Sequence, residues 1–333
     1  MSETPWAELA DIARWAPSPH NTQHWRLNVV DATHAVVAYE PSRLLPLTDA
    51  TGQFQTIGLG IFVEALEIAA RSRGLRLRLE DAPVELDDSP GPVRSFMPIA
   101  LEPCDEPGEF DASLLQERRT SRIRYDGTPV QPETIEALSG LADGTGHEIA
   151  FTSEPAEVAW VVDLNIETLF YDLRHQPARD EIRLWIRKTE REARRTRDGF
   201  SPKCIGFSGH LINGFFGHHR LFDTPGIRHA IRLMYAQAYR GSATVGWIIG
   251  PQAGPQDWFD GGRLLLRFWL GATRAGLVLH PFGSVITNPA AHARLVERVS
   301  IEKEGQEAWL LFRVGQSKRP ARSLRLPVEE IVR

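Results

Sequence analysis

Residues 60–77, which read GIFVEALEIAARSRGLRL, can be aligned without a gap on residues 262–279, which read GRLLLRFWLGATRAGLVL. Each stretch opens with a glycine, is apolar on nearly every face, and closes with Gly-Leu and an alternating segment. A helix that is apolar all round belongs in the centre of a structure. The closing glycines, Gly74 and Gly276, fit C-terminal helix caps, and the residues after them fit strands. The sequence therefore predicts one structural unit that occurs twice.

The predicted unit consists of a helix, a strand, the central helix and a second strand. Its first copy covers residues 1–105 and its second covers residues 111–333, with a turn-rich connector between them. The second copy carries an insertion at about residues 165–240, in which a strongly charged helix is expected at Ala178–Arg197. Long insertions are often lids or binding loops. A solvated helical decoration is the other interpretation.

Composition and charge exclude several classes of protein. With 42% hydrophobic and 24% charged residues, the 333-residue chain can bury a substantial core. Its formal net charge of -5 gives no general reason to expect a nucleic-acid partner. No apolar run reaches the roughly 20 residues that span a bilayer, and the acidic N-terminus does not resemble a secretory signal. Cys104 and Cys204 are too far apart for a CxxC zinc site, so we expect no metal and a cytoplasmic enzyme or binding protein.

A polar loop follows the first predicted helix. Residues 16–25 read APSPHNTQHW, in which two prolines end the helix and Ser, Asn, Thr and Gln crowd hydrogen-bonding groups together. The isoalloxazine edge of a flavin, with its carbonyls and ring nitrogens, suits such mixed donors and acceptors. A loop of this composition can also simply cap itself.

Three more segments carry candidate chemistry. Residues 117–125 read ERRTSRIRY, in which arginines and hydroxyls could cradle a phosphate or form a solvated face. Residues 280–284 read HPFGS and follow the second central helix and its strand; Gly283 would let the backbone approach a ligand closely. Residues 319–330 read RPARSLRLPVEE and form a basic patch near the C-terminus.

Together these segments resemble the FMN-dependent nitroreductase family. The loop is similar to APSxxNxQPW, the arginine run to the RRS opening, residues 276–283 (GLVLHPFG) to the GLxxxPxxG flavin loop, and residues 325–332 to the RxPLEEVV ending. The longer form RRTxRxxY, followed by Pro129-Val130, resembles Acg-type proteins, in which two nitroreductase units share one chain. The resemblance implies an α+β nitroreductase fold of mostly antiparallel sheets flanked by helices, with two pseudo-symmetric halves in one chain and a helical lid insertion.

The resemblance also implies roles for individual residues. It assigns the phosphate and the ribityl chain to Arg118, Arg119, Thr120 and Arg122, with help from Arg322 or Arg325. It lines the flavin ring with Pro17, Ser18, Asn21 and Gln23 from the other half. It places Pro281, Phe282 and Gly283 in the flavin loop, with the backbone N–H of Phe282 or Gly283 directed at flavin N5. His20 and His24 depart from the family pattern; each either touches the ligand or simply packs.

Only one complete flavin site can be assembled from these segments. The first half has the APS loop but begins too late for an RRS motif, and the second half has Ala142-Asp-Gly-Thr-Gly-His147 where an APS loop should stand. The resemblance therefore implies one FMN per chain, in a cleft between the halves, for which a monomer is sufficient and a dimer is possible.

Two functions are compatible with this interpretation. In the first, NAD(P)H reduces FMN, and a nitroaromatic, a quinone or an activated alkene then takes the hydride from N5; a dedicated biosynthetic redox step is a variant of it. The second is an FMN-binding or storage protein whose lid excludes the nicotinamide.

Overall fold

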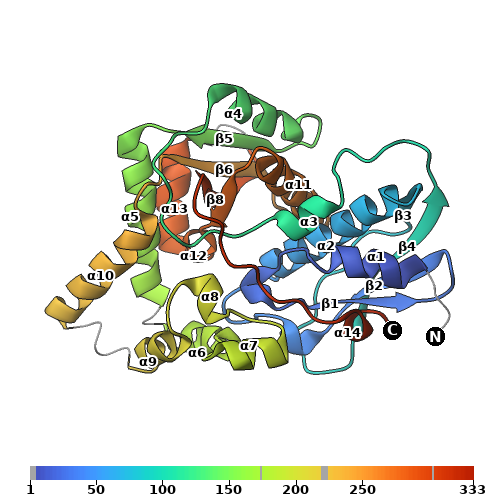
Figure 1. The fold of residues 1–333 in the computed structure, drawn as a ribbon, viewed down its shortest axis with the longest axis horizontal. Coiled ribbons are helices and arrows are strands. Elements are labelled where there is room, and N and C mark those ends of the chain that lie inside the picture. The colour runs from blue at the N-terminus through green and yellow to red at the C-terminus, as the bar shows by residue number, and fades with distance from the viewer. Residues whose placement is uncertain (1–4, 173–174, 219–223, 302–303) are drawn as a thin grey trace.

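The computed structural model describes residues 5–172, 175–218, 224–301 and 304–333 (Figure 1). Its strands form two antiparallel sheets of four strands each, and helices flank both sheets. The predicted α+β class with antiparallel sheets is therefore confirmed. Within the described ranges, no helix combines the length and the apolar character needed to cross a membrane.

The first sheet has the strand order β1-β2-β4-β3. In β3 the sequence Leu-Arg-Leu-Arg-Leu alternates half-buried leucines with exposed arginines, as expected for a strand with one face on the core. The elements of this part of the chain are α1 (Pro5–Ala13), η1 (Pro19–Asn21), β1 (Trp25–Val29), β2 (His34–Tyr39), η2 (Pro41–Arg43), α2 (Gln53–Arg71), β3 (Leu75–Leu79) and β4 (Arg94–Pro103).

The second sheet has the order β5-β6-β8-β7, which repeats the order of the first. Two strands precede the central helix and two follow it in each case, so the predicted unit with one strand on either side was incomplete. Buried strands read as continuous apolar runs, which periodicity alone does not resolve. The elements are α3 (Ser113–Glu117), α4 (Pro132–Ser139), η3 (Gly140–Ala142), β5 (Glu148–Thr152), β6 (Thr244–Pro251), α11 (Pro255–Arg274), β7 (Val278–Pro281), α12 (Gly283–Thr287), α13 (Pro289–Val299), β8 (Gln306–Gly315) and α14 (Val328–Ile331).

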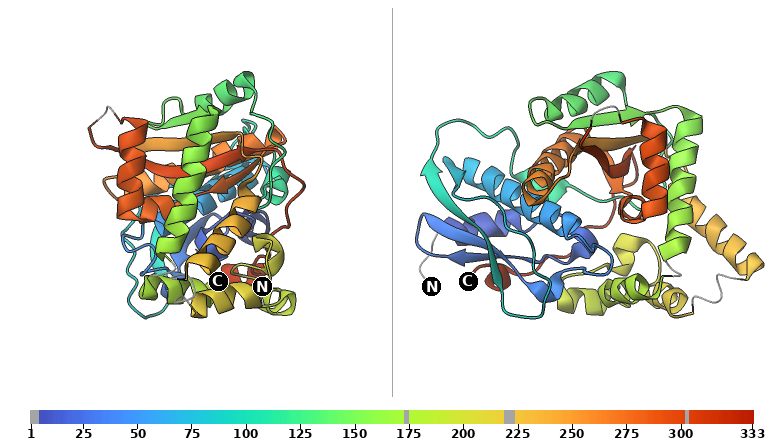
Figure 2. Two further views of the ribbon diagram at one scale, coloured as in Figure 1. Left: turned by 90° about the vertical axis from the view of Figure 1, so that its left-hand side faces the viewer. Right: turned by 180° about the vertical axis from the view of Figure 1, so that it is seen from behind.

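The two central helices, α2 and α11, pack against each other in the middle of the molecule (Figure 2). The contact is made by the two glycines that the alignment pairs, Gly60 and Gly262. A Cβ atom on Gly60 would lie 2.1 Å from the carbonyl oxygen of Phe259, and one on Gly262 would lie 2.1 Å from that of Ile57. Only glycine permits this close approach of the two backbones.

The ends of the central helices agree with the sequence. Gly74 and Gly276 have positive φ angles of 70° and 75°, as a left-handed C-terminal cap requires. Strand β3 starts at Leu75, directly after Gly74, and β7 starts at Val278, two residues after Gly276. The predicted caps and the strands that follow them are therefore confirmed.

The insertion occupies the chain between β5 and β6, residues 153–243, whereas β1 and β2 are joined by residues 30–33 alone. It starts earlier than predicted, because α5 already begins at Pro155; residues 173–174 and 219–223 of the predicted range lie outside the described residues. In Figure 1, α6 and α7 lie on the side of the first sheet, where α6 contacts η1, and α9 lies beyond α6. The helices are α5 (Pro155–Asp172), α6 (Gln176–Trp185), α7 (Glu190–Thr196), α8 (Pro202–Ile205), α9 (Gly209–Gly217) and α10 (Pro225–Tyr239).

The single charged helix predicted at Ala178–Arg197 is wrong, because α6 and α7 are separate helices. Ile186 leaves the helix to form a parallel bridge with Phe200. Thr189 then caps α7, its Oγ1 accepting a hydrogen bond from the backbone N–H of Glu192 at 3.1 Å. The run of charged residues continues through the break and conceals it.

The C-terminal tail, residues 316–333, runs from β8 of the second sheet to β1 of the first (Figure 1). There Val332 forms a parallel bridge with Leu27. The backbone N–H of Val29 donates to the carbonyl of Arg333, and the N–H of Arg333 donates to the carbonyl of Leu27, both at 2.9 Å. The tail thus connects the two sheets across the molecule.

Candidate functional site

The polar loop between α1 and β1 holds an unusual backbone. His20, Asn21 and Gln23 have positive φ angles of 48°, 58° and 51°. Residues other than glycine rarely adopt this region, and such strain persists only where the surroundings impose it, often at functional sites. Within the loop, Ser18 Oγ accepts a hydrogen bond from the backbone N–H of Gln23 at 3.0 Å. Pro17 and Ser18 are half-buried beside it.

Asn21 joins this loop to the tail and to the insertion. Its Nδ2 donates to the carbonyls of Gly199 and Leu324, both at 3.2 Å, and its Oδ1 accepts from Arg325 Nη1 at 2.8 Å. Both amide hydrogens are therefore used within the protein. The side chain of Asn21 therefore fixes three segments of the chain together.

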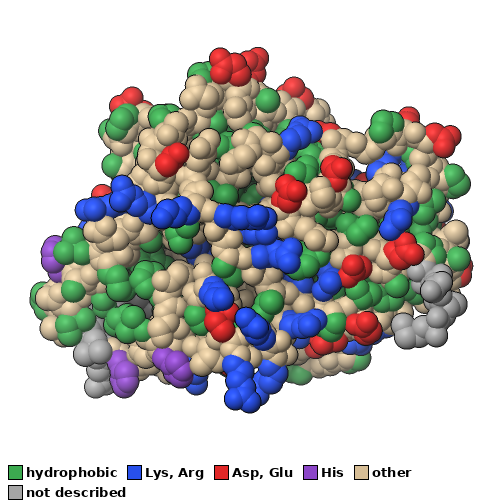
Figure 3. Space-filling model, viewed as in Figure 1, with side chains coloured by type: hydrophobic (Ala, Val, Ile, Leu, Met, Phe, Trp, Pro, Cys, Tyr) green, Lys and Arg blue, Asp and Glu red, His purple; other side chains and the backbone are tan. Residues whose placement is uncertain are grey.

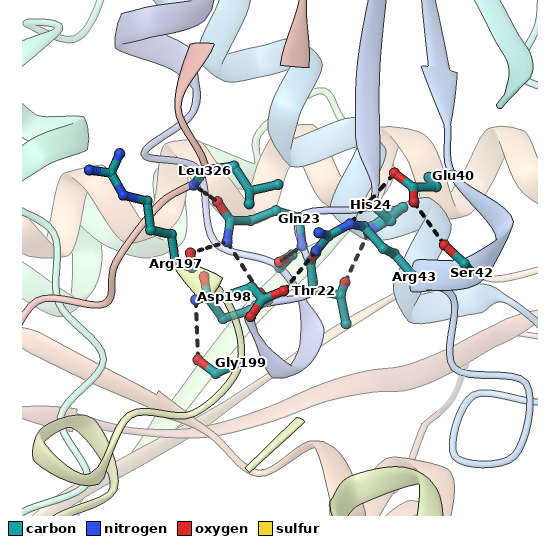
Figure 4. A network of polar contacts seen from close by, with 12 residues as sticks. Thr22, Gln23, His24, Glu40, Ser42, Arg43, Arg197, Asp198, Gly199 and Leu326 are labelled. Carbon is teal, nitrogen blue, oxygen red and sulfur yellow. Dashed lines mark hydrogen bonds and ion pairs between the residues drawn. The ribbon is translucent and has the colours of Figure 1, made fainter. Parts of the chain in front are cut away.

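Gln23 makes a parallel set of contacts. Its Oε1 accepts the backbone N–H of Leu326 at 2.8 Å, and its Nε2 donates to the carbonyl of Arg197 at 3.0 Å. Figure 4 shows this junction, in which Gln23 lies between the tail and the insertion. Next to it, His24 Nε2 lies 2.8 Å from the carbonyl oxygen of Gln55 in α2, so His24 packs against the first central helix.

Arg118 and Arg119 follow the short helix α3. Arg118 is buried, and its Nε and Nη1 atoms have no hydrogen-bond partner among the described residues. Burial, and then the charges of Arg325, Arg119 and Arg122, hold the pKa of Arg118 well below its usual value. Arg119 turns back to donate to the carbonyls of Glu117 and Arg118, at 2.8 and 2.9 Å, while its Nε has no partner among the described residues.

These arginines and the tail line a small pocket, which we call the cradle. Its described lining contains four arginines and two hydroxyl side chains, and no acidic residue. Buried cations without carboxylate partners are costly, and a bound anion removes that cost. The lining consists of Trp15, Leu115, Arg118, Arg119, Thr120, Ala321, Arg322, Ser323 and Arg325.

The cradle lies under a positively charged surface. Besides Arg322 of the lining, the tail exposes two further cationic side chains, those of Lys318 and Arg319. Figure 3 shows Lys and Arg side chains gathered in a band across the middle of the face that the tail crosses in Figure 1. The charge of this face contrasts with the formal net charge of -5 of the whole chain, and it favours the approach of an anion.

The segment Pro281-Phe282-Gly283 lies where β7 ends and α12 begins. The backbone N–H of Phe282 donates to the carbonyl of Leu311 at 2.7 Å, and its side chain is buried. A Cβ atom on Gly283 would meet no described atom within 4 Å, so open space adjoins this residue. Since the amide of Phe282 is engaged, Gly283 is the remaining candidate for a backbone contact with a flavin.

Arg122 lies apart from the pocket lining, against the insertion. Its guanidinium carbon is 5.1 Å from the ring centre of Phe200, and the same ring is 5.1 Å from the imidazole of His20. Burial, and then the charge of Arg122, lower the pKa of His20 to about 4. Phe200 was not predicted, because nothing in its spacing relates it to the polar loop.

Arg313 was also missed. It is fully buried and lies between the rings of Tyr125 and Tyr239, with its guanidinium carbon 4.2 and 4.6 Å from their centres. Its Nη2 donates to the carbonyls of Ser121 and Ile123, at 3.1 and 3.0 Å, and so fixes the backbone that carries Arg122. A lone arginine in the apolar strand Trp-Leu-Leu-Phe-Arg-Val was the available signal.

Asp198 anchors the insertion on the first half of the chain. Its carboxylate accepts from Arg187 Nε and Nη2, at 3.0 and 2.7 Å, and from Arg43 Nη1 at 3.0 Å. All three side chains are largely shielded from solvent. The backbone N–H of Gly199 donates to the carbonyl of Asn21 at 3.2 Å, so the insertion and the polar loop are joined in both directions (Figure 4).

The structure thus brings many of the predicted site residues together. Arg118, Arg119, Thr120, Arg322 and Arg325 line one pocket. Asn21 contacts Arg325, and Gln23 contacts the next residue of the tail. The segment that carries Arg118 and Arg119 runs beside β7, because Thr120 forms a parallel bridge with Leu279, two residues before Pro281. The lining of the cradle itself does not include Pro17, Ser18, Arg122 or residues 281–283.

Comparison with known proteins gives one significant curated match. Over 316 residues the chain is 25% identical to the probable NAD(P)H nitroreductase PigM of Serratia sp. (strain ATCC 39006). The alignment covers 87% of this chain and 83% of PigM. The chain is thus a distant relative of that probable nitroreductase. No family model matches the sequence.

Solved nitroreductases are similar to part of the chain. The FMN- and NADPH-dependent nitroreductase NfnB from Sphigopyxis sp. strain HMH is 13% identical, with a TM-score of 0.42, over 67% of this chain and 97% of that one. The FMN-dependent NfnB from Mycobacterium smegmatis, in complex with NADPH, is 14% identical, with a TM-score of 0.40, over 66% of this chain and 96% of that one.

Proposed function

We propose that the chain is an FMN-dependent oxidoreductase of the nitroreductase type, and that the cradle holds the FMN phosphate. The observation that carries this is the set of arginines gathered around one pocket, with no acidic side chain among the described lining residues. The unpartnered Nε and Nη1 of buried Arg118 and the unpartnered Nε of Arg325 need acceptors, which phosphate oxygens supply. The donors present therefore fit the group.

The other site residues have roles consistent with this proposal. Arg322 and Arg325 complete the cradle from the tail, and Thr120 adds a hydroxyl. Arg122, held by the backbone contacts of Arg313, supplies positive charge near the ring. Open space adjoins the Cα atom of Gly283, which leaves room for the ring to approach the backbone of this residue. Pro17, Ser18, Asn21, Gln23, Pro281 and Phe282 would shape the site around the ring.

Bound FMN supplies hydride transfer at N5, from NAD(P)H to an electron-poor acceptor such as a nitroaromatic, a quinone or an activated alkene. With a quinone, the overall reaction converts NAD(P)H, the quinone and one proton into NAD(P)⁺ and the hydroquinone. The name of the distant relative, a probable NAD(P)H nitroreductase, supports this choice of reductant.

We also propose an Acg-type arrangement, in which residues 1–105 and 111–333 are two related halves that build one FMN site. The repeated strand order and the facing glycines Gly60 and Gly262 support it. The contact of Asn21 with Arg325 joins the polar loop of one half to the tail of the other. One chain would then be sufficient for binding, in the cytoplasm and without a nucleic-acid partner.

A second candidate is an FMN-binding or storage protein with little turnover. It is favoured by the way the insertion packs on the polar loop, since Phe200 contacts His20 and Arg197 contacts Gln23. Anaerobic addition of NADPH or NADH to the flavin-loaded protein separates the two functions. Bleaching by either nucleotide supports the oxidoreductase. Bleaching by dithionite alone supports storage.

The cradle is tested by the double variant Arg118→Ala/Arg119→Ala. We expect loss of the bound FMN from a folded protein, because each charge-assisted contact contributes about 1.5–3 kcal/mol. FMN content is measured by absorbance after denaturation, and folding by circular dichroism. The matched control is Arg191→Ala/Arg194→Ala, two exposed arginines on α7. Equal FMN content in both double variants would overturn the assignment.

A further inference from the structure

Exposed cationic side chains from three separate segments gather beside the cradle. They come from residues 121–127, from residues 240–242 at the end of α10, and from residues 316–322 of the tail. The only acidic residue of these segments is Asp126, whose carboxylate accepts the backbone N–H of Thr128 at 2.9 Å. We call this surface the ridge, and its exposed cations are Arg124, Arg240, Lys318, Arg319 and Arg322.

The backbones of the three segments are held together. The N–H of Tyr125 donates to the carbonyl of Arg240 at 3.0 Å. The N–H of Asp126 donates to the carbonyl of Gln316, also at 3.0 Å. A Cβ atom on Gly241 would lie 2.1 Å from the carbonyl oxygen of Tyr125, so glycine permits a close approach here. The ridge therefore displays its cations from a fixed backbone.

The cations of the ridge lack carboxylate partners. Exposed arginines elsewhere form ion pairs, such as Arg294 with Glu167. None of the five ridge cations forms an ion pair with another described residue; Arg322 instead lies over the ring of Trp15, with its guanidinium carbon 4.2 Å from the ring centre. The ridge lies on the face in Figure 3 where Lys and Arg side chains form a band. It thus presents uncompensated positive charge to the solvent, which attracts an anionic partner.

The ridge has charge but no apolar anchor. The large apolar side chains that the structure exposes include Leu184, Leu211 and Leu233 of the insertion, and none of them belongs to the three segments of the ridge. Stable interfaces and helices that lie on membranes need such side chains. Electron-transfer partners, by contrast, meet over small surfaces in weak encounters that charge steers. The ridge therefore fits a transient partner of opposite charge.

The ridge borders the cradle. Arg322 belongs to both surfaces. Burial, and then the charges of Arg322 and Arg319, hold the pKa of Arg119 in the cradle below its usual value. Since such charges act strongly only at short range, Arg319 lies near the cradle. A partner docked on the ridge lies next to the proposed FMN site without having to enter it.

We propose that the ridge is the docking surface for an acidic electron-carrier protein that donates one electron at a time. The carboxylates of the carrier face the cations of the ridge, and its redox centre lies beside the FMN site. Two reduced carriers and two protons then replace one NAD(P)H and one proton in converting a quinone into the hydroquinone. This inference rests on the proposed function, which places FMN in the cradle.

The test measures docking directly, so that it does not depend on the flavin. The probe is a plant-type [2Fe–2S] ferredoxin, an acidic one-electron carrier of low potential. Its Kd for the full chain is measured by isothermal titration calorimetry at about 50 mM and again at about 300 mM NaCl. The ridge variant is Arg124→Glu/Lys318→Glu/Arg319→Glu, which leaves the arginines of the cradle in place.

We expect the ridge variant to raise the Kd for ferredoxin by about tenfold or more at the lower salt concentration, because like charges then face the carrier. The matched control, Arg191→Glu/Arg194→Glu/Arg195→Glu on α7, changes the net charge equally and should stay within about twofold of the wild type. The higher salt concentration should weaken wild-type binding about tenfold. Reduced ferredoxin should also bleach the flavin more slowly in the ridge variant than in the control, with equal FMN content in both.

Arg124→Gln/Lys318→Gln, which only neutralises charge, keeps the test decisive if the ridge variant does not fold, and should raise the Kd about threefold. Equal Kd values in the ridge and control variants, or a wild-type protein that does not bind ferredoxin, would overturn the inference. Sedimentation with phosphatidylglycerol vesicles that the ridge variant alone loses, without binding of ferredoxin, would overturn it in favour of a membrane surface. A wild-type protein that binds ferredoxin but holds no FMN would retain the docking surface and overturn the proposed function.

Discussion

Replacement of Gly60 by alanine tests the packing of the two central helices. The new Cβ atom would lie 2.1 Å from the carbonyl oxygen of Phe259, and Cβ atoms essentially never approach other atoms within 3.0 Å. The helices must therefore separate locally by at least about 0.9 Å. Since the obstacle is backbone, overpacking should cost about 3 kcal/mol. The better helix propensity of alanine offsets about 1 kcal/mol, which leaves about 2 kcal/mol.

Thermal unfolding followed by circular dichroism measures this loss. A change of about 2 kcal/mol lowers Tm by about 3 °C, since a chain of 333 residues unfolds with an entropy of about 0.7 kcal/mol/K. Gly262→Ala should have a similar effect, since its Cβ would lie 2.1 Å from the carbonyl oxygen of Ile57. Gly214→Ala in α9, whose Cβ would meet no described atom within 4 Å, is the control. A Gly60→Ala protein that melts with the control would refute the close approach of α2 and α11.

Two further substitutions test buried carboxylates, one in the insertion and one in the first half. Asp198→Asn leaves the guanidinium groups of Arg43 and Arg187 without a carboxylate, so we expect the free energy of unfolding to fall by about 3 kcal/mol. Limited proteolysis should then cleave the insertion faster than in the wild-type protein. The control is Asp163→Asn, which removes an exposed ion pair with Arg232 and should be cleaved at the wild-type rate. Burial, opposed by two backbone hydrogen bonds and aided by Glu181, raises the pKa of Asp49 from 3.8 to about 6. The folded protein then keeps a proton that the unfolded chain releases, so this group lowers the free energy of unfolding by about 3 kcal/mol as the pH rises from about 4 to above 6. Urea unfolding at several pH values should show that Asp49→Asn removes this part of the slope, and identical slopes would contradict the shift.

The central helices and the cradle were predictable because their signals are local. An apolar run closed by Gly-Leu identifies each central helix, whatever its surroundings. The run at residues 117–125 carries its own charge pattern, so Arg118 and Arg119 could be named from the sequence. That Arg325 would contact Asn21, 304 positions earlier in the chain, could be expected only through resemblance.

The remaining features depend on contacts that the sequence does not encode locally. Phe200 acquires its place from a bridge with Ile186, which also divides α6 from α7. The resemblance allowed the backbone N–H of Phe282 to contact the flavin, but this N–H already donates to the carbonyl of Leu311 in β8. Arg313 had a visible signal, a charge in an apolar strand, but its partners lie in two other segments.

The route of the tail determines when the site can form during synthesis. Translation completes β1 early, yet the edge of that strand acquires its partners only when residues 332 and 333 have left the ribosome. Until then the edge is open to pairing with other chains, and the contacts of Asn21 and Gln23 with residues 324–326 are missing. Such distant pairing is slow to form, because loop closure must precede it. A nascent chain should therefore gain its capacity for the proposed FMN only after the tail has paired with β1, and until then the open edge of β1 exposes it to aggregation.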